Sequence, residues 1–204
     1  MNWLAHIFIS ENHIDYQLGN LLADPLKGKS WQGSSKKLEE GIRMHGRIDS
    51  FTDSHEVVSK SKSRLGPKGY LKGVIIDIAY DHLLIKNWER YSKKSLEKFI
   101  GEFYEKAIAA AESYPDDAKS FVRRLINSNN LTSYGTVEGL EAAFARIDRR
   151  LSERILSKES AVDYIPVIKR EICGIEKDFL KFFPGLIRHF KSNSEELDSE
   201  HWFR

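Results

Sequence analysis

Apolar residues recur at spacings of three and four along most of the chain, which is the pattern of helices that bury one face. No pair of alternating segments joined by a tight turn is present, so a β-hairpin is not predicted. The pattern predicts an all-α protein, folded as a single-domain helical bundle. We expect helices at about residues 12–24, 36–64, 70–91, 93–113, 117–128, 136–156 and 160–190.

The length and composition fit one soluble domain. The chain has 204 residues, of which 41% are hydrophobic, and its formal net charge is +2. We expect residues 1–190 to form the domain and residues 191–204, which turn polar and acidic, to form a tail. No apolar run reaches the roughly 18 residues of a membrane-spanning helix. Cys173 is the single cysteine, so no disulfide can form within the chain, which favours a cytoplasmic location.

The helix predicted near Tyr70–Trp88 carries apolar residues on nearly every face, which indicates burial. It also contains Asp77, Asp81 and His82. A buried carboxylate must be paired, protonated or bound to a metal. Asp77 and Asp81 lie one turn apart and share a face, so they repel each other unless a cation lies between them. A metal site or active site is the favoured interpretation, and a buried salt bridge to a basic residue of another helix is the alternative.

A second polar group lies in residues 41–56, where His45, Asp49 and Asp53 follow one another at intervals of four. This spacing places the three side chains in one stripe of a helix. The stripe is either a set of metal ligands or a solvated helix face with paired charges.

Two further candidates lie near the N-terminus. His6 interrupts an apolar segment, and Asn20 precedes Asp24 by four residues. Each is weak alone, since a lone histidine among apolar residues is usually a hydrogen-bonded core residue. Taken together, the histidines and carboxylates of the first 82 residues form the oxygen-rich and imidazole-rich ligand set that suits Mn, Fe, Mg or Zn.

The chain contains neither the phosphate-binding loop of nucleotide hydrolases nor the motifs of dinucleotide-binding proteins, serine hydrolases or zinc peptidases. Residues 36–72 hold nine Lys and Arg against five Asp and Glu, a local charge of +4. This excess favours an acidic protein partner, although an ordinary basic helix face is an equal alternative. Aromatic residues are sparse in this segment, which argues against single-stranded nucleic acid.

These residues resemble one known family, the acyl carrier protein phosphodiesterases, also called holo-ACP hydrolases. The likeness runs through separate motifs in the same order and extends to about residue 190. The matching pieces are Met1–His6, Gly19–Asp24, Gly41–His55, Asp77–Leu84 with Trp88, Leu131–Tyr134, Gly139 and Arg149-Arg150.

The resemblance implies an all-helical, divergent relative of the His-Asp metal-dependent phosphohydrolases. Such an enzyme removes 4′-phosphopantetheine from the serine of holo-acyl carrier protein, an acidic protein substrate, and no membrane is involved. The implied cofactor is a divalent metal, with Mn²⁺ preferred over Mg²⁺, Fe²⁺ or Zn²⁺. The candidate ligands are His6, Asp24, His45, Asp77, Asp81 and His82.

Hydrolysis of a phosphodiester also needs an activated water and a cation on the phosphate oxygens. Asp49 is our candidate for orienting the water, and Arg47 is the candidate phosphate clamp. Two other functions stay open from the residues alone. The protein is then a metal-dependent phosphodiesterase or phosphatase for a nucleotide or other small phosphoester, or a non-catalytic helical module that binds carrier protein.

Overall fold

A computed structural model describes residues 1–192 of the chain. The described residues form helices and short 3₁₀ segments, with no β-strand, which confirms the predicted all-α class. None of these helices is long and apolar enough to cross a membrane. The helices are α1 Trp3–Ile9, α2 Ile14–Leu22, α3 Lys36–Ser54, α4 Glu56–Arg64, α5 Lys72–Lys86, α6 Leu96–Ala111, α7 Asp116–Asn127, α8 Val137–Asp148, α9 Glu153–Leu156 and α10 Ile165–Ser192. The 3₁₀ segments are Trp88–Arg90, Ser133–Gly135 and Val162–Tyr164.

The chain breaks into more helices than the apolar spacing predicts. Residues 3–9 form α1, which was not expected. The helix predicted over 36–64 is two helices, because the backbone of His55 is extended and its Nδ1 accepts a hydrogen bond from the N–H of Val57 that caps α4. The helix predicted over 136–156 ends at Asp148, whose carboxylate accepts backbone hydrogen bonds from Ala161 and Val162 and draws the following loop back. Residues 193–204 of the predicted tail lie outside the described part.

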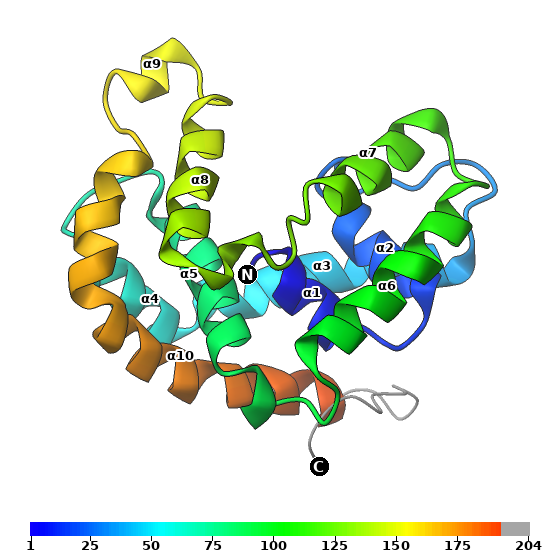
Figure 1. Ribbon diagram of the computed structural model, residues 1–204, viewed down its shortest axis with the longest axis horizontal. Coiled ribbons are helices and arrows are strands. Elements are labelled where there is room, and N and C mark those ends of the chain that lie inside the picture. The colour runs from blue at the N-terminus through cyan, green and yellow to red at the C-terminus, as the bar shows by residue number, and fades with distance from the viewer. Residues whose placement is uncertain (193–204) are drawn as a thin grey trace.

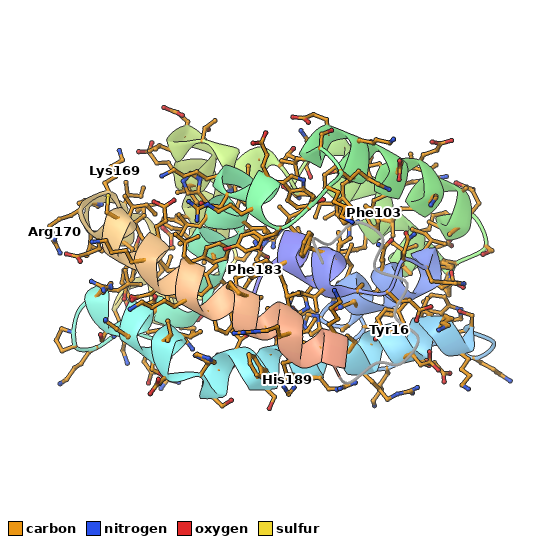
Figure 2. All side chains as sticks on the ribbon, turned by 90° about the horizontal axis from the view of Figure 1, so that it is seen from below. Tyr16, Phe103, Lys169, Arg170, Phe183 and His189 are labelled. Carbon is orange, nitrogen blue, oxygen red and sulfur yellow. The ribbon has the colours of Figure 1, made fainter. Side chains whose placement is uncertain are left out.

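The helices rise in two groups around the start of the chain. Figure 1 shows α8 and α9 standing on one side and α6 and α7 on the other, with α1 and the N-terminus between their bases. Helix α5 is buried along most of its length, as its all-round apolar sequence predicts. Helix α10 runs across the underside, with Phe183 near its middle and Lys169 and Arg170 toward its outer end (Figure 2). Phe183 is fully buried and stacks on Phe179 one turn before it.

A close crossing of two helices fixes the geometry of the N-terminal half. Gly19 of α2 faces the carbonyl of Leu38 in α3, and Gly41 of α3 faces the carbonyl of Tyr16 in α2. A Cβ at either glycine would overlap the opposite backbone. The two helices therefore pack backbone against backbone, and this contact places Asn20 beside His45.

An ion pair also joins α4 to α10. The carboxylate of Asp178 in α10 is almost fully buried and accepts a 2.7 Å hydrogen bond from Nε of Arg64 in α4. The hydroxyl of Ser61 donates to the same carboxylate oxygen at 3.3 Å. Because a buried carboxylate needs such partners, this pair holds the long C-terminal helix against the bundle.

Candidate metal centre

Three side chains from α1 and α3 gather at one point, and a fourth, from the turn after α2, contacts one of them. His6 comes from α1, Asp24 follows α2, and His45 and Asp49 lie one turn apart on α3. Nε2 of His45 lies 3.1 Å from Oδ2 of Asp49 and 3.2 Å from Oδ1 of Asp24. Nε2 of His6 lies 3.2 Å from Oδ1 of Asp49. The carboxylate of Asp49 thus faces both imidazoles.

Asn20 orients both histidines. Its side-chain Oδ1 lies 2.8 Å from Nδ1 of His6, and its backbone oxygen lies 2.8 Å from Nδ1 of His45. Both oxygens only accept hydrogen bonds, so both Nδ1 atoms carry protons and donate them. The amide group is itself oriented, because Nδ2 of Asn20 donates to Oγ of Ser10 and to the carbonyl of His6. Each Nε2 is left as the atom that faces the carboxylates.

The two Nε2 atoms face only hydrogen-bond acceptors. Besides Asp49, Nε2 of His6 faces the carbonyl oxygen of Met1 at 3.1 Å, and Nε2 of His45 is buried without a hydrogen-bond partner. An imidazole lone pair among acceptor oxygens is unfavourable unless a proton or a metal ion lies between them. A proton or a metal ion between these nitrogens and the carboxylates would relieve this contact, so the arrangement is compatible with a bound cation.

The donor spacing suits a metal ion. In six-coordinate geometry with bonds of about 2.1 Å, neighbouring ligand atoms are about 3 Å apart. The nitrogen-to-oxygen distances of 3.1 and 3.2 Å in the cluster match that separation. His6, His45 and Asp49 each offer a ligand atom within 4.8 Å of the others. The side chain of Asp24 is 75% exposed, so the centre is open to solvent on the Asp24 side.

The electrostatics of the metal-free cluster show how strongly it attracts positive charge. Burial disfavours the charged form of His45, but the carboxylates of Asp24 and Asp49 outweigh burial and raise its pKa to about 9. The contact with His45 lowers the pKa of Asp24. Burial alone would raise the pKa of Asp49, yet the two histidines hold it well below its usual value. Burial lowers the pKa of His6, which favours its neutral form.

Asp77 and Asp81 have a different neighbour, the N-terminus of α1. Both oxygens of Asp81 accept backbone hydrogen bonds, from the N–H groups of Leu4 at 2.9 Å and Ala5 at 3.2 Å. Asp77 lies 3.1 Å from the amino group of Met1. These two carboxylates of α5 share a face, as predicted, and that face points at the positive end of a helix. Burial raises the pKa of Asp81 to about 7.

Two other predicted residues also have partners away from the cluster. His82 donates from Nδ1 to the carbonyl of Tyr134 at 2.6 Å and lines an apolar cavity of about 140 Å³ between α8 and α10. Arg47 is exposed and lies over the ring of Phe190, 5.4 Å from its centroid. Because Arg47 and Asp49 are two residues apart, they leave α3 in nearly opposite directions.

The residue pattern predicts neither that Asn20 orients the two histidines nor that the amino group of Met1 contacts this region. The spacing of Asn20 four residues before Asp24 was the available signal. It did not predict that the side chain and the backbone carbonyl of one asparagine serve two histidines, because the carbonyl contact depends on the close crossing of α2 and α3. Nothing in the sequence pattern pointed to the contact of the Met1 amino group with Asp49 and Asp77.

Comparison with known proteins places the chain in a family. A protein of Enterobacter sp. named acyl carrier protein phosphodiesterase is 26% identical over 94% of this chain and 98% of its own length. A Yersinia pestis protein of the same name is 30% identical over 92% of this chain and 96% of its own. A Photorhabdus laumondii relative is 36% identical over 44% of this chain and 46% of its own. No solved structure matches significantly. The family model for acyl carrier protein phosphodiesterase matches residues 1–186, and the chain therefore belongs to that family.

Proposed function

We propose that this protein hydrolyses the phosphodiester that links 4′-phosphopantetheine to the serine of holo-acyl carrier protein. The products are apo-acyl carrier protein and 4′-phosphopantetheine. The observation that carries the proposal is the cluster itself, in which two histidines with protonated Nδ1 atoms direct Nε2 at Asp24 and Asp49. Membership of the acyl carrier protein phosphodiesterase family supports the choice of substrate.

We assign His6, His45, Asp49 and Asp24 as the residues that hold a divalent metal. Imidazole and carboxylate donors without a thiolate suit manganese, and magnesium, iron and zinc are alternatives. When bound, the ion supplies an acidified water and neutralises charge on the phosphate. Asp81, His82 and Arg47 are left out of this set because each has its partner elsewhere in the fold.

The residues of the cluster divide into buried and accessible donors. The side chain of His6 is 1% exposed and that of His45 10%, so the imidazoles form the inner wall. Asp24 is largely exposed and Asp49 partly so, which leaves their side open to a phosphodiester. In the reaction, water oxygen bonds to phosphorus, the bond from phosphorus to the serine oxygen breaks, and the serine oxygen takes up a proton.

We also propose a cytoplasmic location, because holo-acyl carrier protein would be the substrate there and the single Cys173 is unpaired. An acidic carrier protein is the partner that this function requires.

The test is mass spectrometry of holo-acyl carrier protein incubated with the protein and Mn²⁺. Wild type should remove the phosphopantetheine mass, and Asp24→Ala should not. Asp53→Ala is the matched control, because Asp53 is 71% exposed and its carboxylate pairs with Lys62 rather than with the cluster. An unchanged carrier mass with wild type and bound metal overturns the proposed substrate, and turnover of nucleotides would then identify the second candidate. Carrier binding without turnover would identify a non-catalytic module.

A further inference from the structure

The basic segment 36–72, which the sequence suggested as a partner surface, is largely neutralised within the molecule. Five of its nine basic residues lie within 4.0 Å of a carboxylate. Two of the acids are distant in sequence, Glu11 and Asp178. An acidic partner gains little from cations that already have partners. The paired residues are Lys36, Lys37, Lys60, Lys62 and Arg64.

A second basic surface lies between the two raised groups of helices seen in Figure 1. A cleft of about 620 Å³ is lined by Arg124 of α7 and by Arg146 and Arg150 at the end of α8. Trp3 and Phe121 provide its apolar part and contact each other edge to face. No acidic residue lines this cleft, and none of the three guanidinium groups forms an ion pair with another described residue.

One of these arginines, Arg146, is partly buried and lies over the ring of Tyr134, 6.0 Å from its centroid. Nη2 of Arg146 is buried and makes no hydrogen bond within residues 1–192. Nδ2 of Asn2 is also buried and without a hydrogen-bond partner. Burial raises the pKa of Tyr134, and contacts with the side chains of Asn2 and Arg146 lower it in part.

The cleft and the candidate metal centre both contact the first three residues of the chain. Trp3 lines the cleft, and Met1, two residues earlier, contacts Asp49 with its amino group at 3.7 Å. This proximity matters because the bond to be cleaved lies at the attachment serine, so the surface of the carrier protein itself must reach the metal. A docking surface for the carrier must therefore adjoin the centre.

We infer that the cleft between α7 and α8, with Arg124, Arg146 and Arg150, docks an acidic segment of the carrier protein next to its attachment serine. The inference rests on the proposed function, and it names the surface that recognises the substrate. Charge complementarity selects the partner. The three arginines form no ion pair among the described residues and lie on α7, on α8 and in the turn after α8, so they match a segment with several carboxylates. The spread of these cations across two helices suits a protein segment better than a single small anion.

The test compares Arg124→Glu/Arg150→Glu with Arg149→Glu. Arg149 is exposed and adjacent to Arg150 but does not line the cleft, so it controls for a charge reversal beside the cleft. Both cleft arginines in the double variant are exposed, so their reversal should not disturb folding. The measurements are affinity for holo-acyl carrier protein at low salt and turnover of a small chromogenic phosphodiester.

We expect the double variant to bind carrier protein at least about tenfold more weakly and to hydrolyse the small diester at the wild-type rate. Arg149→Glu should match wild type in both assays. Wild-type binding should weaken as salt rises, because exposed charges are screened. Unchanged carrier affinity in the double variant overturns the docking surface, even if the enzyme is active. Absence of phosphopantetheine release by wild type overturns the proposed function instead, and the binding comparison still decides the surface.

Discussion

Oδ1 of Asn20 accepts a 2.8 Å hydrogen bond from Nδ1 of His6 and so fixes Nε2 as the nitrogen of that imidazole that faces Asp49. The Asn20 amide group cannot turn over without losing this bond, because its Nδ2 donates to Ser10. Outer partners of this kind hold a ligand in the correct tautomer and orientation.

Asn20→Ala should weaken metal binding by about 10-fold to 100-fold, the usual effect of losing a partner of a ligand. His45 keeps its partner, because that hydrogen bond goes to the backbone oxygen of residue 20. Mn²⁺ titration calorimetry measures the loss, and the far-ultraviolet circular dichroism of the metal-free protein controls for folding. Wild-type affinity in a folded Asn20→Ala protein would show that His6 is oriented without the amide.

Metal binding should depend on pH through His45. The carboxylates of Asp24 and Asp49 raise the pKa of His45 to about 9 despite its burial, so the metal-free protein holds a proton on Nε2 at neutral pH. That proton stabilises the metal-free fold fully below the unfolded pKa of about 6.5, and its contribution is lost as pH rises through about 9. A metal must displace it. We expect affinity to rise about tenfold per pH unit toward pH 9 and then to level off.

Calorimetry in two buffers of different ionisation enthalpy measures this proton directly. About one proton should be released per metal ion at pH 7.5. His6 contributes none, since burial lowers its pKa and keeps it neutral. A pH-independent affinity between pH 7 and 8.5 would contradict the assignment of His45 as a ligand.

Asp81→Ala should destabilise the protein whether or not metal is present. The substitution leaves the N–H groups of Leu4 and Ala5 buried without acceptors, at a cost of about 3 kcal/mol in the free energy of unfolding. Asp81→Asn keeps one acceptor oxygen and should cost less. Urea unfolding of the metal-free proteins checks this. If Asp81→Asn retains stability but loses metal, Asp81 belongs among the ligands after all.

Asp178→Ala should lower the free energy of unfolding without changing the rate of hydrolysis. Removing a buried carboxylate leaves Arg64 without its main partner, which costs about 3 kcal/mol in the free energy of unfolding. Hydrolysis per folded molecule should stay at the wild-type level. Asp53→Ala removes the exposed pair with Lys62 and should cost less than about 1 kcal/mol. A fall in specific activity for Asp178→Ala would mean that α10 helps to form the centre.

The helical class follows from the apolar spacing alone, but the breaks between helices do not. Residues 36–64 keep a helical pattern straight through His55, and the break there comes from a local cap that periodicity does not register. Helix α1 is only seven residues long, too short for a periodic signal. Its N-terminal N–H groups are satisfied by Asp81, a contact across 77 positions in sequence.

The sequence pattern indicated which residues could form a candidate centre, but not which of them lie together. Histidine and carboxylate spacing indicated a metal, and His45 with Asp49 needed only helical geometry. The choice between Asp49 and Asp81 depended on the direction in which α5 faces α1. Asp81 had the stronger sequence argument, a carboxylate in an all-apolar helix, yet the backbone of another helix explains its burial. A carboxylate whose sequence pattern indicates burial must have a partner, but the pattern does not identify that partner.

The glycine crossing of α2 and α3 makes the candidate metal centre sensitive to residues that have no functional group. A methyl group at Gly41 would force the helices apart at the carbonyl of Tyr16, four residues before Asn20. Moving the helices apart would lengthen the 2.8 Å contact between the Asn20 carbonyl and Nδ1 of His45. Because Gly19 and Gly41 carry no side chains, they set how closely the backbones of α2 and α3 approach. This separation in turn sets where His45 stands relative to Asn20.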